Sequence, residues 1–441
     1  MNKQKWLERA SELGIDGFEI TQTMRKSREV SWFEHKMDTF VTSRILSTSM
    51  RALINDKVVA LSMEKVDDED MDEILNSLKT TAALVSDSEK DELVPVMETE
   101  LVQSTKVWVE PSAEEIKELL ASLEEKLEKA DPRITMVNGL EFSSGRVQSE
   151  LTNSLGVSVA EQGASQVVVG QITMKEDGDL RDGYLVKAVY DIHDFDQDAF
   201  VKELVDDVAS QMHARSLSSR TCPVVLKGEA MSTLFSCFAA MFYGDTIAKG
   251  ISPLTGKLHE KIFSDKITVI DDPRNLDSIY LQNYDDEGHP TYAKTVVDKG
   301  VFETILHNTK SALKMGAEST GNGFKSGGGA TSVSAMNLYI VPGQDDFDTL
   351  LKTMDNGVVI TDLAGMHAGV DFVSANFSLQ ARGYLVENGQ KSRPLTLITI
   401  AGNFLELMKN VEAVGDDLKW EVRSVTCPSI LFTEAAIGGN E

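Results

Sequence analysis

Residues that could hold a transition metal are scarce in this chain and lie far apart in it. Its 441 residues include three cysteines, Cys222, Cys237 and Cys427. An odd number of cysteines without a CxxC motif or a Cys/His cluster favours structural thiols over disulfides or zinc ligands. The seven histidines include no pair spaced three to five residues apart, which excludes the paired-histidine zinc motifs carried by single helices.

Basic residues and long apolar runs are also in short supply. Lysines and arginines number 43 against 70 aspartates and glutamates, a formal charge of −27. This imbalance disfavours direct nucleic-acid binding, because basic side chains are what neutralise phosphates. No apolar run approaches the roughly 20 residues of a membrane span, and residues 1–14 lack the apolar centre of a secretory signal. We therefore expect a cytoplasmic protein with neither a nucleic acid nor a membrane as its partner.

Hydrophobic periodicity divides the chain into three expected regions, residues 1–105, 106–220 and 221–441. The first is predicted to begin with a short helix over 2–14. A β-meander rich in β-branched residues follows, and then a helix that starts in the acidic run 67–73. Two or three helices and a meander therefore make up the expected N-terminal part.

The middle region has the clearest helix signal of the sequence. Ser112 and Glu115 have the spacing of a capping box. The apolar residues that follow form one stripe: Ile116, Leu119, Leu120, Leu123 and Leu127. Strands are predicted between Ile134 and Ile192, and then a second helix over 199–214. We expect the two helices to pack together on a sheet.

The C-terminal region is typical of strands and glycine-bearing loops around one strongly apolar helix. That helix is predicted within residues 228–245, GEAMSTLFSCFAAMFYGD, and we expect it to be buried. Two polar runs, 87–92 and 326–330, are expected to be loops. The fold class that follows is α+β: a mixed N-terminal region with a meander and two or three helices, and a larger C-terminal region of antiparallel strands around a buried helix.

Seven short segments of the C-terminal half occur in an order and spacing that resemble those of the TldD/PmbA family. They are residues 285–291, 319–323, 337–340, 365–370, 376–378, 383–389 and 399–403. Each segment alone is weak, and their order makes the resemblance specific. Before residue 221 it is thinner, with Asn153-Ser154-x-Gly156 as the best match. The resemblance implies a relation to the bacterial and archaeal metallopeptidases of that family, whose older label is modulator of DNA gyrase.

The peptidase subunit of that family has an HExxxH motif in the frame that Phe235, Ser236 and Ala240 occupy here. Phenylalanine and alanine offer zinc no lone pair, and serine cannot take a proton at neutral pH as glutamate can. The segment around Cys427 also resembles the closing strand of the PmbA (TldE) type rather than the zinc-binding segment of the TldD type. The resemblance therefore implies the metal-less, PmbA-like branch, with no catalytic residue and no metal in this chain.

Three functions stay open at this point. The resemblance favours a subunit of a peptidase assembly that processes or degrades small or unfolded peptides. In it, this chain supplies scaffold and substrate chamber, and a TldD-like partner supplies zinc in a heterodimer. The second is an independent metallopeptidase whose non-standard site gathers His259, His289 and His367 on folding. The third is a non-enzymatic homodimer that binds peptides.

The family-like segments supply the candidate substrate-groove or interface residues: Asp286, Glu287, Gly288, Asn322, Asn337, His367, Ser378 and Asn403. Glycines near them permit close backbone approach, so an extended peptide could add to an exposed strand edge. The acids 285–287 could bind a cation, but three consecutive acids before a glycine are more typical of a solvated turn. His367 could line a groove as a donor or general acid, or be held by hydrogen bonds at a strand start.

Overall fold

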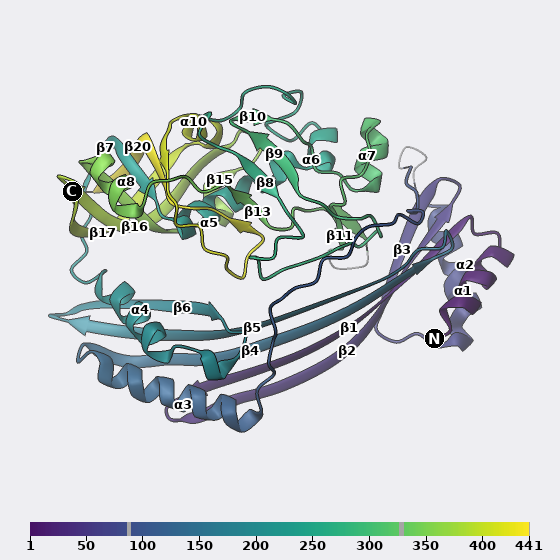
Figure 1. Cartoon of the computed structure of the whole chain (residues 1–441), viewed down its shortest axis with the longest axis horizontal. Helices are drawn as coiled ribbons and strands as arrows, with labels where there is room; N and C mark the ends of the chain where they lie inside the picture. Colours follow the sequence, from purple (N-terminus) through teal and green to yellow (C-terminus); the bar gives the residue numbers. More distant parts are fainter. Residues whose placement is uncertain (86–89, 326–329, 441) are drawn as a thin grey trace.

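A curved sheet of six long antiparallel strands forms one side of the molecule (Figure 1). The structure is a computed structural model that describes residues 1–85, 90–325 and 330–440. Residues 87–89 of the loop expected at 87–92, and residues 326–329 of the loop expected at 326–330, therefore lie outside the described residues. Across the sheet the strands are β3 (Lys57–Met63), β2 (Lys36–Ile54), β1 (Gly17–Phe33), β4 (Ile134–Asn153), β5 (Ser158–Glu176) and β6 (Asp179–Ala188). The predicted regions 1–105 and 106–220 thus contribute three strands each to one sheet.

The two halves of this sheet meet at the ladder between β1 and β4, which runs from Glu19 opposite Asn153 to Trp32 opposite Leu140. Because side chains alternate along a strand, the sheet has two distinct faces. On β1, Ile20 and Val30 belong to the cores under the helices. Thr21, on the other face, accepts a hydrogen bond from Lys325 of the C-terminal region. One face therefore carries the helices, and part of the other contacts the C-terminal region.

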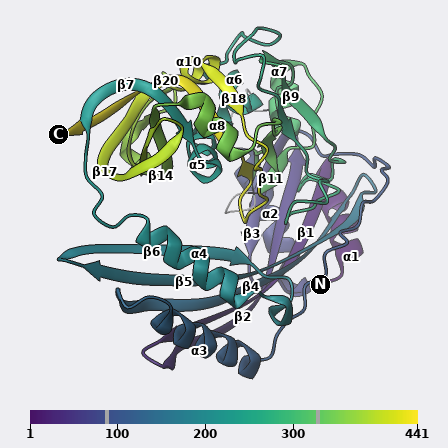
Figure 2. The same ribbon diagram turned by 60° about the vertical axis from the view of Figure 1, so that its left-hand side comes forward.

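Two helix pairs cover the two ends of the outer face (Figures 1 and 2). They are α1 (Lys3–Glu12) with α2 (Met71–Ala82), and α3 (Ala113–Ala130) with α4 (Gln197–Ala209). The first pair buries Trp6 and Leu75 against the sheet, and the second buries Leu120 and Phe200. The expected packing of α3 and α4 together on a sheet is confirmed. Residues 22–28 of β1 lie between the two cores and belong to neither.

The capping box predicted at the start of α3 is present. The Ser112 hydroxyl accepts a hydrogen bond from the Glu115 amide at 3.2 Å, and the Glu115 carboxylate accepts one from the Ser112 amide at 2.7 Å. Replacing Ser112 with alanine is expected to lower the free energy of unfolding by about 1 kcal/mol, because an amide at the helix start loses its acceptor. Urea denaturation measures this loss. Ser236→Ala, at an exposed position within a helix, is the control, and an equal loss in both variants would contradict a capping role.

The C-terminal region is built on a ring of five strands: β7 (Ser218–Leu226), β14 (Gly357–Ala364), β16 (Asn376–Glu387), β17 (Gln390–Asn403) and β20 (Ile430–Asn440). Their hydrogen-bonded order is β14-β7-β20-β17-β16, and β14 also pairs with β16, so the pairings close into a circuit. Most neighbours are antiparallel, as expected. The β14–β7 pair is parallel, because the long intervening chain can cross back before β14 begins.

The remaining elements extend this ring. A second, five-stranded sheet contains β10 (Val301–Phe302), β9 (Lys294–Asp298), β8 (Val269–Asp271), β13 (Leu338–Ile340) and β19 (Val425–Thr426). The other strands are β11 (Gly323–Lys325), β12 (Thr331–Val333), β15 (Val370–Asp371) and β18 (Val411–Val414). The smaller helices are α6 (Gly244–Ala248), α7 (Thr309–Met315), α8 (Phe347–Met354), α9 (Met366–Gly369) and α10 (Phe404–Lys409). Within the described residues, no helix is both long and apolar enough to cross a membrane.

The apolar helix predicted within 228–245 is buried, and the expected α+β fold is confirmed. It is α5 (Gly228–Phe238), which lies within the largest hydrophobic core. The helix is shorter than predicted, since a 3₁₀ turn (Ala239–Phe242) follows it directly. The Thr246 hydroxyl donates to the carbonyl of Ala240 in this turn and to that of Tyr243 just after it.

Candidate functional site

Phe235, at the position that the resemblance aligns with the first zinc ligand of the peptidase motif, is part of the aromatic core. Phe235 is 1% exposed. Its ring centroid lies 5.7 Å from that of Phe404 and 6.2 Å from that of Phe242, and Phe238 stacks on Phe404 at 4.6 Å. Interiors of this kind are close-packed. An apolar side chain packed against other rings has no lone pair to give a metal and leaves no space for a bound water.

The other two positions of the motif point elsewhere. Ser236 is exposed on α5, and its hydroxyl donates to the carbonyl of Thr233 at 2.8 Å. Ala240 lies past the end of α5, in the 3₁₀ turn. The three positions therefore do not converge on one point, and none carries a nitrogen, thiolate or carboxylate. These residues do not fit a zinc ion with a neighbouring base.

The acidic turn 285–288 is not solvated, contrary to expectation. Asp285 and Glu287 are 3% and 0% exposed. Glu287 accepts hydrogen bonds from the amide and hydroxyl of Thr309 and from the hydroxyl of Thr331. Gly288 has a φ of +92°, a conformation that favours glycine. The carboxylates are buried because each has internal donors, which a sequence pattern of three acids does not disclose.

This turn is joined to the long sheet through a buried ion cluster. Arg51 of β2 lies 3.3 Å from the Glu19 carboxylate of β1 and 3.6 Å from that of Glu287. Asp91 lies at 3.9 Å from the same guanidinium. Burial raises the pKa of Glu19, and it raises the pKa of Asp91 to about 6. Burial also opposes ionisation of Glu287, but the charge of Arg51 and the two threonine hydroxyls outweigh it and lower the pKa of that carboxyl. The cluster thus links the long sheet to the C-terminal region through ion pairs.

Asn322 and Asn337 lie in a second buried polar network. The Asn322 side-chain amide donates to Asp271 at 2.8 Å, and Asp271 pairs with Lys294 at 3.2 Å. Asn337 donates to the carbonyls of residues 272 and 280 and accepts from the Ser278 hydroxyl. Both asparagines are at most 1% exposed. Their hydrogen-bonding groups are used within the protein, where they fix the loops around the second sheet.

His367, Ser378 and Asn403 are brought to one end of the strand ring. Asn403 lies opposite Asn376 in the β16–β17 ladder and caps α10. Ser378 is exposed on β16, and its carbonyl abuts Gly369 at the end of α9, the short helix that carries His367. His367 is exposed. Of the predicted candidates, His367 and Ser378 are the ones open to a peptide or a partner, and they lie apart from the buried turn 285–288.

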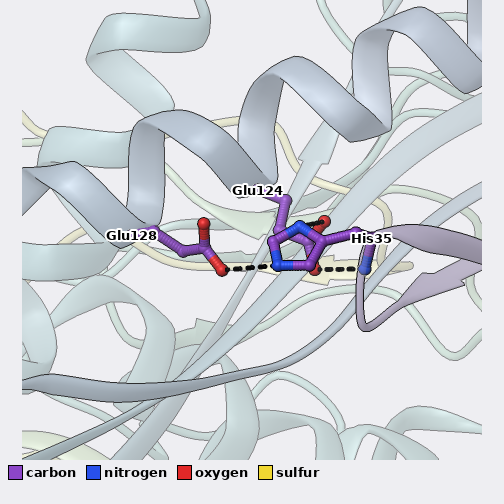
Figure 3. A group of neighbouring side chains, drawn as sticks. All are labelled: His35, Glu124 and Glu128. Carbon is purple, nitrogen blue, oxygen red and sulfur yellow. Dashed lines mark hydrogen bonds and ion pairs between the residues drawn. The ribbon is translucent and has the colours of Figure 1, made fainter.

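One group of metal-binding side chains is close enough to hold an ion in the described part of the chain: His35, Glu124 and Glu128 (Figure 3). His35 Nδ1 lies 3.0 Å from Glu124, and its Nε2 lies 3.4 Å from Glu128. Glu124 also accepts from the Trp32 indole at 2.6 Å. Because both ring nitrogens already face carboxylates, the group ties the β1–β2 turn to α3. His259, His289 and His367 are not members of this group.

The buried pair Glu19 and Arg51 was not predicted from the sequence, although the sequence contains a signal for it. Glu19 stands between Phe18 and Ile20, Arg51 stands between Met50 and Ala52, and the two lie opposite each other in register. Opposite charges inside two apolar strand segments indicate a buried pair. His307 gave no such signal. It is 4% exposed, burial lowers its pKa to about 4, and its ring lies where a side chain on Gly244 would be.

The long helix-covered sheet joined to a strand ring around an aromatic helix defines a fold class that solved structures share. A Thermotoga maritima protein that carries the gyrase-modulator name has a TM-score of 0.88 at 27% sequence identity, with 99% of each chain covered. TldE from Thermococcus kodakarensis has a TM-score of 0.90 at 23% identity, covering 99% of this chain and all of the other. The class is therefore that of the gyrase-modulator and TldE structures.

Sequence comparison places the chain more narrowly. Residues 107–216 match the PmbA/TldA metallopeptidase central domain, and residues 219–439 match the PmbA/TldA metallopeptidase C-terminal domain. The chain is 29% identical over 333 residues to the metalloprotease PmbA of Escherichia coli O157:H7, which is 75% of this chain and 71% of that protein. The chain belongs to the TldD/PmbA metallopeptidase family, as the resemblance implied.

Proposed function

We propose that this chain is the metal-less subunit of a TldD/PmbA-type peptidase assembly. It supplies scaffold and part of the substrate chamber, and a TldD-like partner supplies zinc and the catalytic glutamate. The observation that carries the proposal is the packing of four phenylalanine rings around Phe235, the residue that the resemblance aligns with a zinc ligand. A member of a metallopeptidase family without donors at that point requires them from another chain if it is to take part in catalysis.

The exposed end of the strand ring is the face we assign to the peptide or the partner subunit. His367 and Ser378 lie there, on α9 and β16. β16 is paired along much of its length on both sides, with β17 on one side and with β14 and β15 on the other, so a peptide has little free edge to join along this strand. Side chains, rather than backbone addition, would then hold a peptide at this end. Small or unfolded peptides fit that arrangement because they bring flexible backbone to a fixed surface.

Metal content and dependence on a partner test the proposal together. The chain, purified without a metal-binding tag, is expected to contain far less than one zinc by elemental analysis. Mixed with an HExxxH-bearing member of the family, it is expected to form a stable complex by size-exclusion chromatography and to confer peptidase activity that neither chain shows alone. About one zinc per chain would instead favour an independent metallopeptidase. If the two chains form no complex and no peptidase activity is stimulated, the result would favour a non-enzymatic homodimer that binds peptides.

A further inference from the structure

The outer face of the long sheet carries a cleft that the function proposed above does not use. The cleft has a volume of about 300 Å³, within the range of small-ligand pockets. It lies where residues 108–111 contact β1 and β4. These residues belong to the connection between α2 and α3, which crosses the sheet in Figure 1. Its lining includes four basic side chains, Lys26, Arg28, Arg44 and Arg146. This concentration of positive charge contrasts with a chain of formal charge −27.

Strand register places three of these cations in one row. Lys26 of β1 lies opposite Arg44 of β2 on one side and opposite Arg146 of β4 on the other. Neighbouring strands are about 4.8 Å apart, so the row is about 10 Å long. Like charges directly opposite one another destabilise a sheet, and no described residue is within ion-pair distance of Lys26 or Arg44. An anion lying over the row would relieve that repulsion.

The wall of the cleft is held in place by contacts of its own. Glu110 lies 3.2 Å from the Arg28 guanidinium and 3.6 Å from that of Arg146. The Trp108 ring packs on Tyr190 with a centroid distance of 4.2 Å, and the Trp108 carbonyl accepts from Arg146. Four cations therefore face a single carboxylate, beside an indole ring whose position is fixed.

Two buried polar atoms in the lining lack a partner. Gln166 is 3% exposed, and its Nε2 donates to the carbonyls of Val109 and Tyr190. Within the described protein its Oε1 has no hydrogen-bond partner, and neither does Nε of Arg28. Buried polar atoms are nearly always satisfied. Both atoms belong to lining residues, so part of the hydrogen-bonding capacity of this lining is not used within the described protein.

We propose that this cleft binds a nucleoside polyphosphate, with the phosphates over the cation row and the base beside Trp108. Guanidinium groups match phosphate oxygens in bidentate geometry, and an indole face is a stacking surface for a base. An extended acidic peptide is a poorer match. Its carboxylates on one side recur about every 7 Å, whereas the cations recur about every 4.8 Å. Successive phosphates are closer together and can engage neighbouring cations.

Isothermal titration calorimetry of the full chain with ATP in low-salt buffer tests this site. Arg44→Gln is expected to weaken ATP binding about tenfold, since one charge-assisted contact is lost. Arg25→Gln removes the same charge from an exposed residue on the opposite face of β1, and it is expected to change binding less than twofold. Trp108→Leu is expected to weaken ATP binding but to leave inorganic tripolyphosphate binding unchanged.

Four results would overturn the proposal. The first is the absence of measurable ATP binding at low salt, and the second is an equal effect of Arg44→Gln and Arg25→Gln on ATP binding. The third is tripolyphosphate binding as tight as ATP binding, with no effect of Trp108→Leu. The fourth is tighter binding of a poly-glutamate peptide than of ATP. The third result would assign the cleft to an inorganic polyanion. The fourth would assign it to acidic protein segments. Melting temperatures of the variants show whether each is folded, and Arg44→Gln is expected to melt no lower than the parent chain because it removes one of two facing like charges.

Discussion

Replacing Arg51 with methionine is expected to lower the free energy of unfolding by about 3–5 kcal/mol, the usual cost of leaving buried carboxylates without their cation. Arg51 is 2% exposed and lies between Glu19, at 1%, and Glu287, at 0%. Methionine fills a similar volume, so the loss reports charge rather than a cavity. Urea or thermal denaturation at pH 8 measures it. Arg25→Met, at an exposed position on β1, is the control and is expected to change stability by about 0.5 kcal/mol or less.

The same variant is expected to be less impaired at pH 5 than at pH 8. The pKa of Asp91 is raised from the usual 3.8 to about 6, so its protonated form is favoured by folding. The stability this group contributes is complete below pH 3.8 and is lost as the pH rises through 6. The pKa of Glu19 is raised in the same direction by burial. Without Arg51 both acids are expected to hold their protons to higher pH, which relieves the charge at pH 5. A penalty equal at both pH values would exclude the buried ion cluster as its origin.

Truncating Phe235 to alanine is expected to cost about 3–5 kcal/mol, because the side chain is fully packed and its neighbours are other rings. Thermal denaturation and a fall in the urea midpoint measure the loss. Phe40→Ala is the matched control, since that ring on β2 is 43% exposed, and about 0.5 kcal/mol or less is expected there. A small loss for Phe235→Ala would mean that the core can collapse onto the cavity and that the position is loosely packed.

Introducing the residues of the peptidase motif tests the packing around Phe235 through zinc binding instead of stability. In the triple variant Phe235→His, Ser236→Glu and Ala240→His, we expect no tight zinc binding by calorimetry. Position 235 faces the core, position 236 faces solvent, and position 240 lies beyond the end of α5. Ligands need both a common point and partners that orient them. Tight binding of one zinc per chain would show that the pocket is more adaptable than its packing indicates.

Local signals in the sequence were sufficient for much of the fold. The capping box of Ser112 and Glu115 and the leucine stripe behind it depend on residues three or four apart, so the periodicity predicted α3 correctly. The apolar run of α5 predicted its burial for the same reason. Its end was predicted less well, because buried apolar residues continue through the 3₁₀ turn Ala239–Phe242 and a hydrophobic pattern does not separate that turn from the helix.

Features that depend on register between distant strands could not be obtained in that way. The turn 285–288 was expected to be solvated, and its burial follows from Arg51, more than 200 positions earlier in the chain. The cation row needs Lys26 and Arg146 side by side, which only the β1–β4 ladder provides. Both sites are built from residues that are ordinary in their own segments. The distribution of charged residues along the sequence therefore did not predict where charges gather in the folded protein.

The strand ring also constrains how this protein is made. β7 is hydrogen-bonded to β20, and Leu226 lies opposite Ile430, about 200 residues later in the chain. At ribosomal elongation rates of 5–20 residues per second, roughly 10–40 s pass between the synthesis of β7 and that of its partner strand β20. During this interval the apolar α5 lacks part of the core that buries it. The first six-stranded sheet has no such dependence and can form while the rest is being translated. A chaperone that shields apolar segments at the ribosome is expected to raise the yield of folded chains by protecting α5 in that interval.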